Sequence, residues 1–181
     1  MDELMAEILV SEDQIQARIK ELAAEIAAEY QDKRPLMVCV LKGGMPFMAD
    51  LVKQMDIILD LDFMDVSSYG DGFESSGEVK IIKDLSEPVK GRHVIFVEDI
   101  VDTGRTLTYL YDLLQSRQAA SIKTVSLLDK PARRSQDFQA DWIGFEIPDK
   151  FVVGYGLDYE GALRNYPQIA VLKESVYMDR D

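Results

Sequence analysis

The sequence predicts an α/β protein with a central parallel sheet flanked by helices, and three observations support this prediction. Short apolar runs alternate along the chain with amphipathic segments of helical period. Several of the apolar runs are continuous, as in strands that are buried on both faces. The 181 residues are 47% hydrophobic and 29% charged, which is enough for one sizeable core. We therefore expect residues 1–181 to form a single domain.

In the first part of the chain, turn and capping signals separate the expected elements. The first helix follows a capping box at residues 11–14 and keeps apolar residues at helical spacing to about Tyr30. A continuous apolar run after Pro35 predicts a buried strand, and a helix follows Gly43-Gly44. The next segment alternates apolar and polar residues, as a half-buried strand does. These elements are a helix at 11–30, a strand at 36–41, a helix at 45–54 and a strand at 56–66 with Ile57, Leu59, Leu61 and Phe63 on one face.

The second part of the chain begins with a loop at residues 67–77 that is rich in glycine and serine. Long polar loops between strands are often mobile lids, so we expect a lid here. Alternating strands and helices follow, which implies right-handed crossovers and a parallel sheet. These elements are strands at 79–83 and 94–97, a helix at 106–115, and strands at 124–128, 142–145 and 151–154.

Composition excludes several classes of function. The net charge of −13 argues against a nucleic-acid partner, because affinity for nucleic acid rests on clustered Lys and Arg. The N-terminus lacks the basic region of a signal peptide and no apolar run is long enough to span a membrane, so we expect a cytoplasmic protein. Cys39 is read as a small buried hydrophobe, and His93 stands alone, which excludes a His-based triad or a Cys/His metal cluster. Trp142 is read as packing.

Adjacent carboxylates follow the apolar strand at 94–97, and they indicate a ligand site. Glu98 and Asp99 repel each other, so a strand that ends in both requires a cationic or hydroxyl-rich partner. The turn 102–106 follows, with two threonines and a glycine before a helix, which is an anion cradle suited to a phosphate monoester. A sugar diol, bound directly or through Mg²⁺, would satisfy the carboxylates. The alternative is that they are solvated turn residues and that Asp102 is an N-cap.

The motif from Val94 to Thr106 resembles the phosphoribosyl-pyrophosphate motif of the type I phosphoribosyltransferases, in the version of the hypoxanthine-guanine phosphoribosyltransferases. The resemblance extends from about Leu9 to Lys173. It implies the type I phosphoribosyltransferase fold, with a small hood formed by the N-terminal segment and residues from about 135 to 181, and a flexible lid at 67–78. It also implies purine salvage: phosphoribosyl pyrophosphate and hypoxanthine or guanine give IMP or GMP and pyrophosphate. Mg²⁺ as cofactor and a homodimer or homotetramer are implied as well.

Further segments match the same family and imply residue roles, although each segment alone would be read as a solvated turn, a mobile loop or a core aromatic. Arg133 and Arg134 have no implied role and are expected on the surface. The family often has a cis peptide before the pyrophosphate-loop lysine, which here is the Leu41-Lys42 bond. The implied roles are catalysis by Asp102; ribose and 5′-phosphate binding by Glu98, Asp99, Thr103, Gly104, Arg105 and Thr106; pyrophosphate binding by Lys42, Gly43 and Arg164; purine binding by Lys130, Phe151, Val152 and Asp158; lid closure by Ser68 and Tyr69; and metal binding by Glu98, Asp99 and Asp158.

Two alternative functions remain open from the sequence. One is a regulatory relative that keeps the nucleotide pocket but acts by binding RNA or DNA, against which the acidic balance speaks. The other is an enzyme of the same reaction that prefers xanthine or guanine alone. Residues 130–158 do not decide the base preference.

Overall fold

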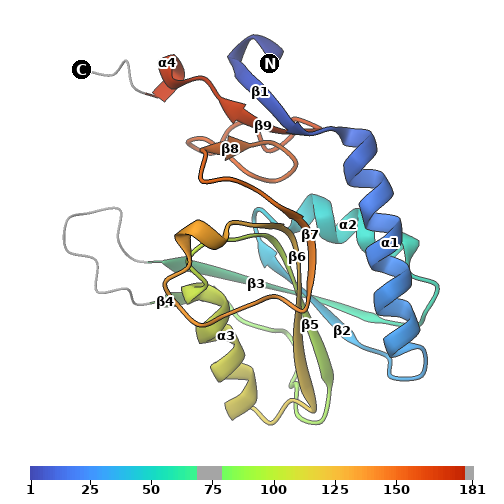
Figure 1. The fold of residues 1–181 in the computed structure, drawn as a ribbon. Coiled ribbons are helices and arrows are strands. Elements are labelled where there is room, and N and C mark those ends of the chain that lie inside the picture. The colour runs from blue at the N-terminus through green and yellow to red at the C-terminus, as the bar shows by residue number, and fades with distance from the viewer. Residues whose placement is uncertain (69–78, 178–181) are drawn as a thin grey trace.

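The computed structural model describes residues 1–68 and 79–177, which form a mixed α/β structure (Figure 1). Within this part of the chain, the main sheet has six strands in the order β4-β3-β2-β5-β6-β7, and a smaller sheet has the order β1-β9-β8. The strands are β1 (Met5–Val10), β2 (Leu36–Leu41), β3 (Asp60–Ser68), β4 (Val79–Lys83), β5 (His93–Val101), β6 (Ser121–Asp129), β7 (Trp142–Glu146), β8 (Val152–Val153) and β9 (Ile169–Leu172). The α-helices are α1 (Glu12–Tyr30), α2 (Met45–Gln54), α3 (Arg105–Ser116) and α4 (Glu174–Tyr177).

The main sheet is parallel apart from the edge strand β4, which pairs antiparallel with β3. Helices α1 and α2 cover one face and α3 covers the other (Figure 1). Alternate residues of β2 therefore enter two different cores: Met37 and Cys39 pack on the α1 and α2 side, while Val38 and Val40 pack on the α3 side. This double burial explains the continuous apolar run that the sequence shows for β2.

Helix α1 begins where its capping box predicts. The Ser11 hydroxyl accepts a hydrogen bond from the Gln14 amide at 3.3 Å, and the Gln14 side chain accepts one from the Ser11 amide at 2.9 Å. Two of the otherwise unpaired amides at the helix start are thereby satisfied. The apolar face of the helix is fully buried through Ile15, Ile19 and Leu22.

The smaller sheet lies beyond the carboxyl ends of β2, β5 and β6, and both ends of the described chain lie beside it (Figure 1). Its strands come from both chain ends, since β1 pairs antiparallel with β9 and β9 with β8. Residues from about 135 onward, which are expected in the hood, contribute to both sheets. β7 pairs in parallel with β6 and belongs to the main sheet, so the smaller sheet takes its C-terminal strands from Val152 onward.

The expected burial of the strand at 56–66 is wrong in part: Ile57 and Leu59 pack against the core on the α1 and α2 side, but Leu61 and Phe63 do not. β3 begins at Asp60, and its buried side chains are Asp62 and Met64, whereas Leu61 and Phe63 are 49% and 36% exposed. Met64 packs into the α3-side core, while Leu61 and Phe63 face the α1 and α2 side near the sheet edge, where no described helix covers them. The apolar alternation therefore does not mark the buried face of this strand.

The remaining expected elements are confirmed to within a few residues at their ends. Strand 79–83 and helix 45–54 agree with β4 and α2, and helix 106–115 begins one residue earlier as α3. The sequence reading missed β1 and β9, which pair across most of the length of the chain. Trp142 is confirmed as a packing residue, since its ring contacts that of Tyr30 at 6.3 Å between centroids.

Candidate active site

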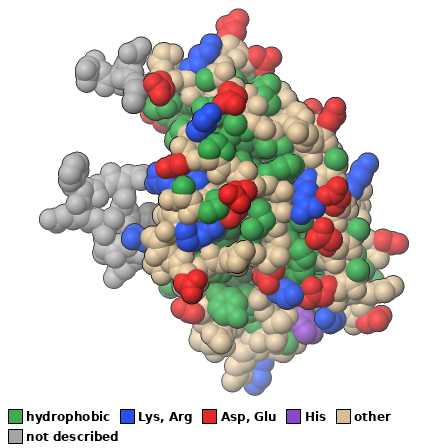
Figure 2. Space-filling view, in the orientation of Figure 1, with side chains coloured by type: hydrophobic (Ala, Val, Ile, Leu, Met, Phe, Trp, Pro, Cys, Tyr) green, Lys and Arg blue, Asp and Glu red, His purple; other side chains and the backbone are tan. Residues whose placement is uncertain are grey.

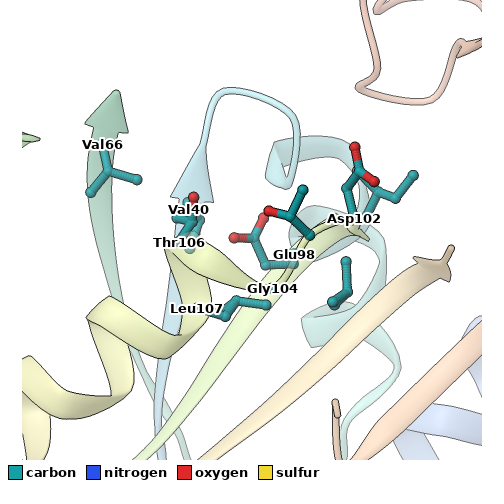
Figure 3. A pocket seen from close by; sticks show the side chains of 10 residues that line it. Val40, Val66, Glu98, Asp102, Gly104, Thr106 and Leu107 are labelled. Carbon is teal, nitrogen blue, oxygen red and sulfur yellow. The ribbon is translucent and has the colours of Figure 1, made fainter. Parts of the chain in front are cut away.

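The turn between β5 and α3 borders a cavity at the carboxyl edge of the main sheet. Gly104 adopts a left-handed conformation with φ of 82°, and α3 begins at the next residue. The cavity has a volume of about 210 Å³. Figure 3 shows the Glu98 carboxylate directed toward the start of α3, while the Asp102 carboxylate points away from Glu98. The residues that line the cavity are Val40, Val66, Glu98, Ile100, Val101, Asp102, Thr103, Gly104, Thr106 and Leu107.

We define residues 102–106 as the phosphate-binding turn, because its geometry suits an anion. The turn precedes the twelve-residue helix α3, whose first amides and positive dipole end favour negative charge. Thr103, Gly104 and Thr106 all line the cavity. Arg105 is different: its side chain is exposed, and its amide donates to the Thr103 hydroxyl at 3.4 Å.

The two carboxylates near the end of β5 differ in exposure, since Glu98 is buried and Asp99 is partly buried. Glu98 is 7% exposed, and burial followed by repulsion from Asp99 raises its pKa well above the usual range. Burial also raises the pKa of Asp99, to about 6, although its side chain accepts a hydrogen bond from the Ile100 amide at 2.8 Å. Asp99 points to another part of the rim than Glu98, because a Cβ atom at Gly43 would collide with the Asp99 carboxylate. The pair therefore spans two neighbouring subsites.

This donor set fits Mg²⁺. Two neighbouring carboxylates whose ionisation is opposed by burial gain from a divalent cation with a preference for oxygen. Among residues 1–68 and 79–177, no group of three or more His, Cys, Asp or Glu is placed to hold a metal. Mg²⁺ is usually held by one or two carboxylates together with substrate phosphates, and Glu98 and Asp99 are two such carboxylates.

A second group of residues gathers around the turn between β2 and α2. The Leu41-Lys42 peptide bond is cis, as the family resemblance implies. Gly43 is buried against Asp99, and a Cβ atom at Gly156 would collide with the Gly43 carbonyl. The Arg164 guanidinium donates to the Gly156 carbonyl at 2.6 Å, so Arg164 is brought to the same place.

Asp158 lies at the outer side of this group and is already engaged. One of its carboxylate oxygens is 2.7 Å from the Arg164 guanidinium, and the other accepts from the Gly161 amide at 2.7 Å. Arg164 also lowers the pKa of Asp99 by its positive charge, although burial is the larger influence on that group. The structure therefore joins Asp158, Arg164 and Gly43 in one cluster beside Asp99.

A third group lies where β6 faces the segment before β8. Lys130 is 8% exposed, and its ammonium donates to the Lys150 carbonyl at 2.9 Å. The next residue, Phe151, is 45% exposed, and its ring meets that of Tyr159 edge-on at 6.0 Å between centroids. Val152 begins β8 and is buried. An ammonium donor and an accessible aromatic ring are thereby brought to one side of the rim.

Asp102 is the first residue of the phosphate-binding turn, and ion pairs connect it with this third group. Its Oδ1 atom has no hydrogen-bond partner among the described residues, although the Arg133 guanidinium is 3.4 Å away. Arg133 also lies 3.8 Å from Asp149, which in turn is 3.9 Å from the Lys130 ammonium. A chain of ion pairs from Asp102 through Arg133 and Asp149 thereby leads to Lys130.

Three further expectations concern the lid, Cys39 and membrane-spanning segments. The lid lies mostly outside the described residues: Tyr69 is not described, and Ser68 is the last residue of β3. Cys39 is confirmed as a buried residue, and burial raises its thiol pKa to about 12. No helix in the described part of the chain is long and apolar enough to cross a membrane.

Arg134 is the main residue that the sequence reading missed. It was expected on the surface, yet its side chain is only 17% exposed and pairs with Asp129 behind the phosphate-binding turn. Gly156 was also missed as a contact of the pyrophosphate loop. The doubled arginine after Lys130 and the two glycines around Tyr155 were visible signals, but neither indicates a role without the spatial arrangement.

Comparison with known proteins agrees with this geometry. The family described as the phosphoribosyl transferase domain matches residues 6–160. The chain is 59% identical to the hypoxanthine-guanine phosphoribosyltransferase of Bacillus subtilis over 94% of both chains. It is 56% identical to 26% of the bifunctional protein TilS/HprT of Listeria innocua, with 95% of this chain covered.

A solved structure is equally similar. The hypoxanthine phosphoribosyltransferase of Staphylococcus aureus superposes with a TM-score of 0.94 and 50% identity, covering 98% of this chain and 96% of that one. The main parallel sheet with helices on both faces is thus the fold of those structures. The chain belongs to the phosphoribosyltransferase family.

Proposed function

We propose that this chain transfers the 5-phosphoribosyl group of phosphoribosyl pyrophosphate to hypoxanthine or guanine, giving IMP or GMP and pyrophosphate in purine salvage. One observation carries the proposal: Glu98 and the phosphate-binding turn line the same cavity, so both ends of a ribose 5-phosphate can be held there. The names of the relatives from Bacillus subtilis and Staphylococcus aureus support the same reaction.

In the proposed reaction, a purine nitrogen forms a bond to ribose C1 while the bond from C1 to the pyrophosphate oxygen breaks. Positive charge grows on the sugar, as in other transfers through an oxocarbenium-like transition state. Thr103, Gly104 and Thr106 anchor the 5′-phosphate, and Arg105 contributes its amide at the helix start. Anchoring the phosphate holds C1 in line between the two reacting groups.

The leaving pyrophosphate is assigned to the second cluster. Lys42 is exposed, and with the amide of Gly43 and the guanidinium of Arg164 it opposes the growing negative charge. Glu98 and Asp99 hold the ribose hydroxyls and would hold a Mg²⁺ ion, and Asp158 would be the ligand of a second ion. Bound Mg²⁺ would supply Lewis-acid stabilisation of the pyrophosphate oxygens.

The purine is assigned to the third group. Phe151 stacks on the base and the backbone of Val152 reads its edge. Lys130 donates a hydrogen bond to the 6-oxo group of hypoxanthine or guanine. Adenine has an amino group at this position, which cannot accept that hydrogen bond, so adenine leaves the Lys130 donor unpaired. Asp102 takes the proton on N7 as the bond to C1 forms, and its Oδ1 atom supports this role because it has no hydrogen-bond partner among the described residues.

Three wider inferences belong to the same proposal. Ser68 and Tyr69 close over the reacting centre and exclude water, which would otherwise hydrolyse the sugar cation. The protein acts in the cytoplasm as a homodimer or homotetramer. The half-exposed Leu61 and Phe63 on β3 support self-association, since contiguous exposed apolar residues mark contact surfaces. Sedimentation equilibrium would measure the number of subunits.

A spectrophotometric assay tests the function. Purified protein is incubated with phosphoribosyl pyrophosphate, Mg²⁺ and one of hypoxanthine, guanine, xanthine or adenine. The proposal predicts nucleotide formation with hypoxanthine and guanine, and none with adenine. Product from xanthine alone or guanine alone would replace the stated base preference, and no product from any base would overturn the proposed reaction.

A further inference from the structure

We propose that Arg134 is a positioning residue that braces the phosphate-binding turn from the side opposite the cavity. The inference rests on the proposed function and adds to it a residue that does not itself touch the substrate. Arg134 lies in the segment after Lys130, outside the residues that line the cavity in the described part of the chain. Its guanidinium reaches back to β6 and to the turn at the same time.

Two contacts fix the guanidinium. One terminal nitrogen pairs with the carboxylate of Asp129, whose side chain is 8% exposed. The other donates to the backbone carbonyl of Asp102 at 2.8 Å. The stem of the side chain also packs on the turn, since its Cδ atom is 3.3 Å from the position that a Cβ atom would take at Gly104.

The residues after Arg134 hold the next carbonyl of the turn. The amides of Ser135 and Gln136 both donate to the Thr103 carbonyl, at 3.0 and 3.2 Å. Two consecutive carbonyls of the phosphate-binding turn are therefore bound from outside by residues 134–136. This segment forms a hook behind the turn.

Fixing these carbonyls also orients the amides that face the cavity. In a planar trans peptide, the C=O of one residue and the N–H of the next point in opposite directions. A carbonyl of Asp102 held outward therefore turns the Thr103 amide inward, and a carbonyl of Thr103 held outward does the same for the Gly104 amide. Thr103 and Gly104 are two of the residues that line the cavity, so the hook preorganises donors for the 5′-phosphate.

The same contacts connect the phosphate subsite with the purine subsite. Asp129 is the last residue of β6 and directly precedes Lys130, whose amide donates to the Val101 carbonyl at 3.0 Å. Arg134 therefore links the strand end that carries the base-reading lysine to the turn that carries the phosphate donors. Only arginine suits this place, because its planar fork can serve two acceptors at once, whereas a lysine ammonium is a single point charge.

The test compares Arg134→Lys with a matched control, Arg117→Lys. The Arg117 guanidinium also makes two hydrogen bonds, both to the Asp84 carboxylate, at 2.7 and 2.6 Å. Arg117 does not line the cavity. Arg134→Lys keeps a positive charge beside Asp129 and loses the second contact. We expect its KM for phosphoribosyl pyrophosphate to rise and its kcat to fall, so that kcat/KM falls by about 10²-fold. The reason is that a small displacement of the turn amides also displaces the reacting C1 atom of the bound substrate. We expect the KM for hypoxanthine to stay within about 3-fold, because Lys130 keeps its contacts.

The dissociation constant of IMP, measured by calorimetry, gives a readout independent of turnover, and we expect it to rise with the KM for phosphoribosyl pyrophosphate. If Arg134→Lys does not fold, the pair Asp129→Asn and Arg134→Gln, which leaves no buried charge unpaired, is measured by the same criteria. Unchanged KM for phosphoribosyl pyrophosphate, an equal rise in both KM values, or failure of both variants to fold would overturn the positioning role. Inactive wild-type protein would instead overturn the proposed function.

Discussion

Glu98 and Asp99 lie next to each other near the end of β5, and burial raises the pKa of both, with repulsion from Asp99 as a second cause for Glu98. Such an arrangement destabilises the protein when no cation is bound, because a desolvated carboxylate loses its hydration. It is retained where the site binds a cation or a sugar diol. The position of the pair thus serves the binding site and lowers the stability of the protein without a bound cation.

The pH dependence of stability follows from the raised pKa of Asp99. The folded protein without metal binds the Asp99 proton more tightly than the unfolded chain, so this stabilisation is full below about pH 4 and is lost as pH rises through about 6. We expect Asp99→Asn to raise the free energy of unfolding at pH 7.5 by on the order of 2–3 kcal/mol, and by little at pH 4. Urea unfolding in EDTA at both pH values measures this difference.

Asp84→Asn is the control for that experiment. The hydrogen bonds from Arg117 lower the pKa of Asp84, so its stabilising effect has the opposite sign: it is present above the unfolded pKa and lost on acidification. Loss of this carboxylate should lower stability at pH 7.5. If Asp99→Asn destabilised the metal-free protein at pH 7.5 as Asp84→Asn does, the claim that burial opposes ionisation of Asp99 would be wrong.

The proposed catalytic carboxylate makes a separate prediction. Asp102→Asn should retain binding of phosphoribosyl pyrophosphate, because the turn amides and the threonine hydroxyls remain, but it loses the group that accepts the N7 proton. We expect kcat to fall by about 10²- to 10⁴-fold with little change in the KM for phosphoribosyl pyrophosphate. Wild-type turnover in this variant would refute the role of Asp102.

Single residues also mark the limit of sequence reading. The motif from Val94 to Thr106 is contiguous, so its residues could be assigned to one site before the structure was known. Arg134 could not, because its role depends on reaching a carbonyl 32 positions earlier in the chain. A buried arginine on a short polar segment looks the same in sequence as a solvated one.

Among the elements, the connection from β2 to α2 leaves no room for a side chain at Gly43. Gly43 lies between the Asp99 carboxylate and the backbone of Gly156, and an added methyl group would meet Asp99. The turn therefore joins the main sheet to the segment that follows β8. Its glycine is required by close approach of neighbouring groups.

Gly43→Ala tests this contact. We expect kcat/KM to fall by about 10²-fold, because the displaced turn and Asp99 both belong to the proposed pyrophosphate subsite. Gly91→Ala is the control: it lies at the amino end of β5 with open space around it, and its φ of 73° predicts only a stability cost of about 1–2 kcal/mol. Equal loss of activity in both variants would contradict the special role of Gly43.

The elements differ in how well sequence reading predicts them. β2 and α1 are determined by local signals, a continuous apolar run and a capping box, and both were predicted. The face expected for β3 is covered only before the strand begins, at Ile57 and Leu59. Near the sheet edge Leu61 and Phe63 are uncovered, while Asp62 is buried and accepts hydrogen bonds from Phe63 and Ser86. β1 and β9 were missed because their pairing joins residues near opposite ends of the chain.

For the whole molecule, the two sheets have separate parts in the proposed reaction. The main sheet supplies, at its carboxyl edge, the groups that bind the phosphate and the sugar in the proposed reaction. The segments around the smaller sheet supply Phe151 and Arg164. Contacts such as that between Gly156 and Gly43 fix one part against the other. Long-range pairing of this kind is set by the assembled fold and is not visible in local sequence periodicity.

The surface charge of the whole molecule tests the alternative of a nucleic-acid-binding regulator. The chain carries a net charge of −13, and the face in Figure 2 shows basic side chains interspersed with acidic ones. We expect no retention of labelled RNA or DNA on filters at low salt, because affinity requires clustered positive charge. Saturable binding that weakens steeply with added salt would favour the regulatory alternative.

The central claim is that the carboxyl edge of the main sheet holds a sugar phosphate between Glu98 and the start of α3. A crystal structure with IMP and Mg²⁺ tests it most directly. The account predicts the 5′-phosphate within hydrogen-bond distance of the amides of residues 103–106, the ribose hydroxyls beside Glu98 and the base against Phe151. IMP bound elsewhere, or bound here with its phosphate away from the turn, would contradict the account.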